Sequence, residues 1–244
     1  MLSIAGDFDP AAAKQLVEQY FGAIPRGKDR PPLPGMELPK TFGEPRRLVV
    51  EDDVALPRLY VAFRSPTFGS DSYYVASIVG AILGMRRGSR LHRSLVRERQ
   101  IAADATAFTF DLAKGADLLV ADITGRPETT PEKLEQEVNR EIDLLMTNGA
   151  RQEEVDRAIA LIETDMITAI QSASERADRL SMFATFFGDP TLINRQSDKY
   201  RSVTLAQVNE FARTKLGVNN RASLLFVPKA ERADEGENIE PAAA

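Results

Sequence analysis

The side chains that could do chemistry in this chain are few, and two common classes are almost absent. The 244 residues include no cysteine and a single histidine, His92. Without thiols the sequence holds no disulfide, zinc finger, iron–sulfur cluster or thiol nucleophile. With one imidazole it cannot supply a metal site that needs two, including the His-Glu-x-x-His site of zinc hydrolases. The composition therefore excludes these sites from the sequence.

His92 could serve as a general base or as a lone metal ligand. It follows Leu91 in a charged segment, and Glu98 stands six positions further on. Residues six apart do not share a helical face, because neighbours on a helix are three or four apart. We therefore expect His92 to pack against the protein or face solvent.

A basic run is the densest cluster of charge. It comprises Arg86, Arg87, Arg90, Arg93, Arg97 and Arg99. Guanidinium groups so placed could bind peptide carboxylates or phosphates. The alternative, which we favour, is a solvated helix face whose arginines pair with Glu98 and other acids. Glycines recur at 80, 84 and 88, but no Gly-Lys-Ser/Thr follows them, so a phosphate-binding loop is not predicted.

Three carboxylates, Asp111, Asp117 and Asp122, could form a site for a hard cation such as Ca²⁺. They lie on or beside two expected strands, where alternation turns polar side chains outward. We expect them to be solvent-exposed instead. The Gly-x-Ser-x-Gly motif is absent, so the nucleophile elbow of α/β-hydrolases is not supported.

The size, composition and net charge of the chain limit the class of protein further. A chain of 26.9 kDa with 43% hydrophobic and 27% charged residues is ordinary for a soluble globular protein. A net charge of -5 argues against nucleic acid as the main partner. No apolar stretch approaches the roughly 20 residues of a membrane span. We expect a soluble chain, in the cytoplasm or the periplasm depending on any segment before Met1.

The elements that position these residues fall into four regions. Residues 1–24 read as a short strand at 2–5 and a helix that Asp9 caps and Pro10 begins. Residues 25–45, rich in proline and glycine, predict a linker. Residues 46–228 form the main α+β domain, and residues 229–244 predict a disordered acidic tail.

Within the main domain, strands and helices come in pairs. Strands are expected at 47–50, 58–64, 102–112, 118–124 and 223–227, the middle two joined across Lys114-Gly115. Helices are expected from Asp71, from Ser89, over 131–148 and from a Thr204/Gln207 capping box. This order favours an antiparallel sheet covered by helices on one face.

The longest periodic segment runs from Val155 to Ala184. Its apolar residues recur with a mean spacing near 3.6, which predicts one long amphipathic helix. A coiled coil is an alternative, but a helix lying on the neighbouring sheet is favoured. Gly188-Asp189-Pro190 ends it. At the other end of the chain, Met1–Ala5 is similar to the final strand, which suggests that a domain is missing upstream.

Several ordered segments together resemble the M16 (pitrilysin/insulinase/mitochondrial-processing-peptidase-like) zinc metallopeptidases. They are Gly6-Asp7 with 17–25, Tyr73 to Gly84, Gly88-Ser89-Arg90-Leu91 through Arg97-Glu98, 174–180 with Arg176, and Gly188-Asp189-Pro190. The resemblance covers Met1 to about Pro228 and is to the family's second, inactive domain.

The resemblance implies a LuxS/MPP-like metallohydrolase fold, duplicated α+β domains and a clamshell chamber around unfolded peptides. The family's zinc ligands belong to a His-x-x-Glu-His helix in a catalytic domain. The helix in the matching place here, Tyr74 to Val79, carries no ligand. The resemblance thus implies no catalytic or metal residue in this chain, with zinc held by an upstream or separate catalytic domain. The resemblance implies structural or chamber-wall roles for Gly6, Asp7, Ser89, Arg90, Leu91, Arg97, Glu98 and Arg176.

Many members of the family also carry an Arg–x₆–Tyr pair in a non-catalytic domain. No tyrosine here has arginine seven positions before it, so that role is not transferred. The alternative is a non-enzymatic scaffold or core subunit of the same fold that assembles with a partner. A homodimer is a further possibility, which we would accept as biological only for an interface well above about 1,000 Å².

Overall fold

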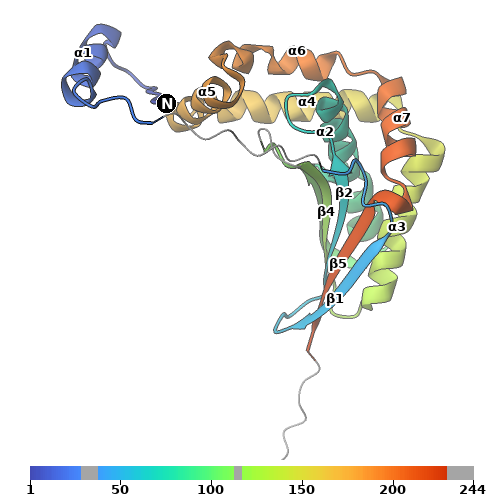
Figure 1. Cartoon of the computed structure of the whole chain (residues 1–244). Helices are drawn as coiled ribbons and strands as arrows, with labels where there is room; N and C mark the ends of the chain where they lie inside the picture. Colours follow the sequence, from blue (N-terminus) through green and yellow to red (C-terminus); the bar gives the residue numbers. More distant parts are fainter. Residues whose placement is uncertain (29–37, 113–116, 230–244) are drawn as a thin grey trace, which may run out of the picture.

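The computed structural model describes residues 1–28, 38–112 and 117–229, and in them one five-stranded sheet has helices packed on one of its faces (Figure 1). The strand order is β1-β5-β2-β4-β3. The bounds are β1 Arg46–Asp52, β2 Arg58–Ser65, β3 Ala102–Thr109, β4 Asp117–Gly125 and β5 Arg221–Pro228. The α+β prediction is confirmed.

The pairing differs in one place from the antiparallel sheet that the sequence predicts. β2 pairs antiparallel with β4 and β5, and β3 with β4, but β1 runs parallel to β5. The first two strands are therefore not neighbours, because the last strand lies between them. Alternating side chains indicate which face of a strand is buried, but they carry no information about which strand is its neighbour.

The helices follow the predicted order. Their bounds are α1 Pro10–Phe21, α2 Asp71–Gly84, π-helix η1 His92–Glu98, α3 Pro131–Asn148, α4 Gln152–Ala169, α5 Ala173–Phe187, η2 Pro190–Arg195, α6 Gln196–Arg201, α7 Leu205–Lys215 and η3 Val218–Asn220. The Thr204/Gln207 capping box is confirmed at the start of α7. Of the helices in the described part of the chain, none combines the length and apolar character of a membrane span.

Helix α2 is the centre of the core, and glycine lets it lie directly on the sheet. Eleven of its fourteen residues are buried. A Cβ on Gly84 would stand 1.8 Å from the backbone nitrogen of Ala107 in β3, and one on Gly80 would stand 3.5 Å from the backbone of Phe108. The four-residue glycine spacing therefore serves close helix–strand contact.

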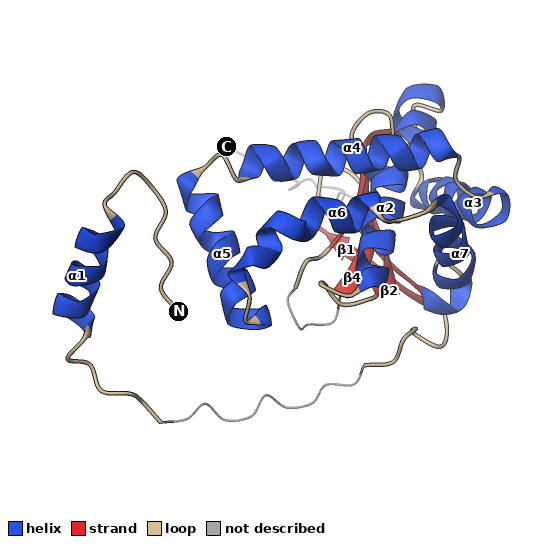
Figure 2. Cartoon of the chain, turned by 90° about the horizontal axis from the view of Figure 1, so that it is seen from above, coloured by secondary structure: helices blue, strands red, loops and turns tan. Residues whose placement is uncertain are grey.

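The single long helix predicted over 155–184 is wrong, because it is two helices. α4 ends at Ala169, and α5 begins at Ala173 after Ser172, whose hydroxyl accepts a hydrogen bond from the Glu175 amide. Figure 2 shows α5 turning sharply away from α4. The apolar period continues across the break, so periodicity alone did not reveal the N-cap serine.

Helix α1 stands apart from the sheet and its helices in both views (Figures 1 and 2). Asp9 caps α1 as predicted, but no residue of α1 is buried. The predicted strand at 2–5 is wrong, since these residues have no strand conformation. A strand needs a partner for its backbone hydrogen bonds, and no described segment provides one. Part of the predicted linker (29–37), the Lys114-Gly115 turn and the tail from 230 lie outside the described residues.

Candidate functional site

Helix α2 occupies the place where the M16 resemblance would put zinc ligands in a catalytic domain. From Tyr74 to Val79 its side chains are aromatic, aliphatic or a single hydroxyl, with no imidazole or carboxylate. Within residues 1–28, 38–112 and 117–229, no three His, Asp or Glu side chains come close enough to hold a metal ion. The residues from Tyr74 to Val79 therefore offer no set of donors that fits zinc.

The basic run lies on and around η1, and most of its charge is neutralised within the protein. Arg86 pairs with Asp165, Arg93 with Glu98, and Arg99 with Glu137 and Glu141. Ser94, buried on η1, donates to Glu141 and accepts from Arg99. These contacts support the paired-face interpretation over a site that grips free anions.

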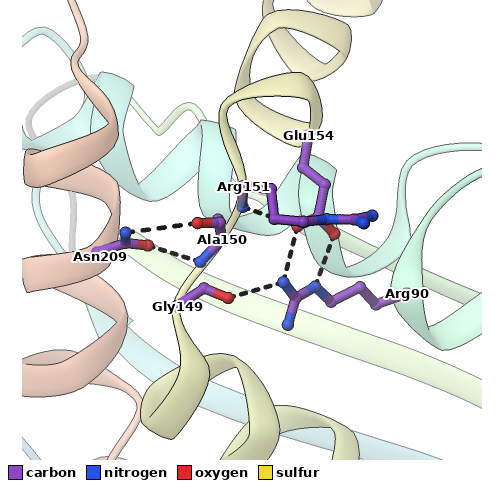
Figure 3. Close-up of polar contacts among 6 residues, drawn as sticks. All are labelled: Arg90, Gly149, Ala150, Arg151, Glu154 and Asn209. Carbon is purple, nitrogen blue, oxygen red and sulfur yellow. Dashed lines mark hydrogen bonds and ion pairs between the residues drawn. The ribbon is translucent and has the colours of Figure 1, made fainter.

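Arg90 is the most deeply engaged of these arginines (Figure 3). Its Nε and Nη2 donate to the two carboxylate oxygens of Glu154, each at 2.8 Å, and Nη2 also donates to the carbonyl oxygen of Gly149 at 2.8 Å. The Glu154 side chain is 4% exposed and that of Arg90 is 13% exposed. A bidentate pair so buried fixes the segment before η1 onto the turn between α3 and α4.

The same turn is held from the other side by α7. Asn209 accepts from the Ala150 amide at 2.6 Å and lies against Gly149, whose φ is +72°. Figure 3 shows Arg90 and Asn209 approaching the turn from opposite sides. Three elements that are distant in the sequence thus meet at one turn, and Nε and Nη2 of Arg90 hold them there.

The electrostatics of Glu154 reflect this pairing. Burial alone would raise the pKa of Glu154, but hydrogen bonds from Arg90 and the Arg151 amide, together with their charges, lower the pKa to about 2. Glu154 therefore stays ionised across the physiological range. Sequence reasoning did not identify Glu154, because its partner lies 64 residues away.

The other residues that were expected to belong to a family motif lie in different places. Ser89 and Leu91 are buried, and the Ser89 hydroxyl donates to the carbonyl of Arg86. Arg97 and Glu98 are exposed at the end of η1. Ser89 to Glu98 lie in one stretch of chain at and before η1, whereas the remaining residues expected to belong to the motif lie in other parts of the structure.

Those remaining residues are Gly6, Asp7 and Arg176. Gly6 and Asp7 are exposed in the N-terminal segment. Arg176, on α5, donates through Nε and Nη2 to the carbonyl oxygen of Ile170, at 3.1 and 3.0 Å. It thereby joins the end of α4 to the start of α5.

His92 begins η1 and is partly buried. Its Nδ1 is buried without a hydrogen-bond partner among the described residues, and no carboxylate cluster accompanies it. This environment is that of a packing histidine.

The three aspartates considered for a cation do not converge. Asp111 pairs with Arg179, and Asp122 pairs with Arg58. The expectation that Asp117 is exposed is wrong, since it is 1% exposed and accepts a hydrogen bond from the Phe68 amide. Burial raises the pKa of Asp117 to about 6 despite backbone hydrogen bonds to its carboxylate.

A cavity of about 340 Å³ lies between α2, α4, α5 and α6. Aromatic rings from Phe68, Tyr73, Phe183 and Tyr200 line it, and Arg179 and Asp111 lie beside it. Burial raises the pKa of Tyr200 to about 12, so this hydroxyl is protonated at neutral pH. Sequence reasoning missed this cavity because the α4–α5 break that helps form it was read as continuous helix.

Comparison with known proteins identifies the family to which this fold belongs. Residues 1–162 match the family model described as the peptidase M16 inactive domain. The chain belongs to that family. A curated relative of this M16 chain, the zinc protease PqqE of Helicobacter pylori, is 23% identical over 176 residues. That alignment takes in 71% of this chain and 39% of PqqE.

Solved structures, one of them a peptidase M16 inactive domain, show the same fold. A protease from Helicobacter pylori matches 92% of this chain and 54% of its own, with a TM-score of 0.80 and 19% identity. A peptidase M16 inactive domain from Pseudomonas fluorescens matches 92% of this chain and 52% of its own, with a TM-score of 0.74 and 19% identity. The M16 chain thus spans about half of these structures and less of its curated relative.

Proposed function

We propose that this chain acts as the non-catalytic domain of an M16-type zinc metalloendopeptidase and forms one wall of a chamber in which unfolded peptides are hydrolysed. The observation that carries the proposal is membership of the inactive-domain family combined with an α2 segment, Tyr74 to Val79, that has no imidazole or carboxylate. Zinc, the water that it activates and the general base would come from a catalytic M16 domain, upstream or on a separate chain.

The N-terminal segment supports a catalytic partner. Leu16, Tyr20 and Phe21 of α1 are each more than half exposed, and no residue of α1 is buried. Exposed apolar residues grouped on one helix indicate an interaction surface. In our proposal, residues 1–24 belong structurally to the catalytic domain and residues 25–45 connect it to the domain at 46–228.

A second candidate is a scaffold or core subunit of the same fold that takes no direct part in hydrolysis. The absence of the Arg–x₆–Tyr spacing favours it. The two candidates differ in whether the catalytic domain needs this chain for peptide turnover, beyond needing it for assembly.

Metal content and turnover of the purified chain test the proposal. We expect less than stoichiometric zinc by elemental analysis and no cleavage of a long unfolded peptide. Co-expression with a catalytic M16 domain that carries the His-x-x-Glu-His helix should yield a complex that cleaves the peptide. Stoichiometric zinc with turnover by this chain alone would overturn the proposal, and an inactive but stable complex would favour the scaffold.

A further inference from the structure

We propose that the cavity between α2, α4, α5 and α6 is a binding pocket for one large apolar side chain, such as phenylalanine or leucine, of an extended peptide. The inference rests on the proposed function only in taking unfolded peptides as the ligands. It adds a specific anchoring point within this non-catalytic chain.

The shape and lining of the cavity suit such a side chain. Its volume of about 340 Å³ lies within the range of ligand pockets. Four aromatic rings, from Phe68, Tyr73, Phe183 and Tyr200, line the cavity together with aliphatic side chains. Aromatic rings favour edge-to-face contact with a further ring and also pack well against aliphatic groups.

The walls are held in place before any ligand arrives. The Phe68 and Tyr73 rings meet edge to face with centroids 5.0 Å apart. The Tyr73 hydroxyl accepts from Thr109, and the Tyr200 hydroxyl donates to Ser77. A rigid pocket binds without first being ordered, which favours affinity.

The break between α4 and α5 forms one side of the cavity. Ala169 and Ile170 at the end of α4 line it, as do Arg179 and Phe183 of α5. Arg176 holds the two helices at this break through its bonds to the Ile170 carbonyl. A continuous helix would carry the α5 residues away from the cavity, so the bend is a condition for the pocket.

The charges around the pocket favour a neutral side chain. Arg179 donates to Asp111 at 3.0 Å and to Glu175 at 2.9 Å, so its charge is already paired. Burial would lower the pKa of Arg179, but these two acids raise it overall, which keeps the pair ionised. A charged side chain in the pocket would lose its hydration and gain no free opposite charge in return.

The mouth of the pocket is suited to a peptide main chain. Ile167 lines the cavity and is 53% exposed. Asn194 and Ser197 bring an amide and a hydroxyl to the same lining. An extended peptide could place its apolar side chain among the rings while its amides meet these polar groups, as ligand pockets commonly combine the two.

Methyl NMR of the full chain tests the pocket directly. The chain would carry ¹³C-labelled isoleucine and methionine methyl groups, which place reporters on Met166, Ile167, Ile170 and Ile193. The probe is an unfolded twelve-residue peptide with a single phenylalanine, and its control has serine at that position. We expect saturable shifts at the four reporters and nuclear Overhauser contacts from the phenylalanine ring, with the phenylalanine peptide alone.

Two variants of α4 form a matched pair. Ala169→Phe places a ring inside the cavity, whereas Ala160→Phe places one on an exposed position of the same helix. Ala169→Phe should weaken binding about tenfold or more, because burial of a phenylalanine side chain is worth at least that factor. Ala160→Phe should leave binding unchanged.

Equal shifts with both peptides, or shifts without contacts to the four reporters, would overturn the pocket. The contacts in the unmodified chain decide the question even if Ala169→Phe fails to fold. The experiment measures peptide binding to this chain alone and does not depend on hydrolysis. A negative result therefore leaves the proposed peptidase role standing, whereas a failure of that role would leave the peptide-binding result unchanged.

Discussion

The Arg90 guanidinium meets both carboxylate oxygens of Glu154 at 2.8 Å, although the two residues are 64 positions apart. The pair is buried and adds a bond to the Gly149 carbonyl. Arg90 thus acts within the domain, where it fixes the α3–α4 turn.

Replacing Arg90 should destabilise the fold strongly. Arg90→Ala removes the bidentate partner of the buried Glu154 carboxylate and leaves it only Arg151, and breaking a buried pair costs about 3–5 kcal/mol. Chemical denaturation monitored by circular dichroism would measure the loss. Arg93→Ala is the matched control, because its pair with Glu98 is exposed and 3.6 Å long, and we expect a change within about 0.5 kcal/mol. Similar losses for both variants would contradict this account.

Glycine at position 84 should be indispensable, unlike glycine at 88. Gly84→Ala would place a methyl group 1.8 Å from the Ala107 nitrogen, which forces α2 off the sheet. We expect a loss of at least about 3 kcal/mol in the free energy of unfolding. Gly88→Ala meets only the Arg157 side chain, at 3.7 Å or more. It should be close to neutral, and a large loss there would show that the glycine spacing has another cause.

Asp117 should make stability depend on pH between about 4 and 6. Its pKa is about 6 in the folded protein and 3.8 ordinarily, so the folded state holds the proton more tightly. The stability that this carboxyl contributes is therefore full below pH 3.8 and is lost as the pH rises through 6.

Asp117→Asn removes this titration and keeps an oxygen for the Phe68 amide. The variant should gain stability relative to the original chain as the pH rises from 4 to 6, by at most about 3 kcal/mol. Unfolding of both proteins at a series of pH values measures the difference. The titration of other groups, including Glu154, contributes equally to the stability of both proteins. Parallel pH profiles would therefore refute the assignment of this pH dependence to Asp117.

Arg176 should control the bend between α4 and α5. Arg176→Ala removes both hydrogen bonds to the Ile170 carbonyl. We expect faster hydrogen exchange at the amides of residues 171–178 and a loss of about 1 kcal/mol. Arg157→Ala, an exposed position on α4, is the control and should leave exchange unchanged. Unaltered exchange in Arg176→Ala would mean that Ser172 alone holds the bend.

Local signals in the sequence predicted most of the elements. Asp9 and Thr204 each cap the helix that they were expected to cap. Proline and glycine mark the helix ends at Pro131 and Gly188. These signals succeed because a cap depends on residues within one turn of it.

What the sequence did not reveal depends on contacts between distant residues. The parallel β1–β5 pair joins Arg46 to Ala222, and no short pattern specifies it. Asp117 is at the start of β4, where alternation predicted exposure, yet Phe68 covers it from another segment. The bend at Ile170 occurs inside an unbroken apolar period. The candidate cavity depends on this bend, because residues on both sides of it line the cavity, and the cavity was therefore not predicted.

The most direct test of the central claim is the effect of this chain on peptide hydrolysis by a separate catalytic M16 domain. We expect kcat/KM for a long unfolded peptide to rise and saturate as the chain is added, although the chain alone cleaves nothing. Serine at Leu16, Tyr20 and Phe21 together should weaken this effect without lowering the melting temperature, because these side chains are exposed. A rate that stays at the level of the catalytic domain alone would contradict the proposed role in the chamber.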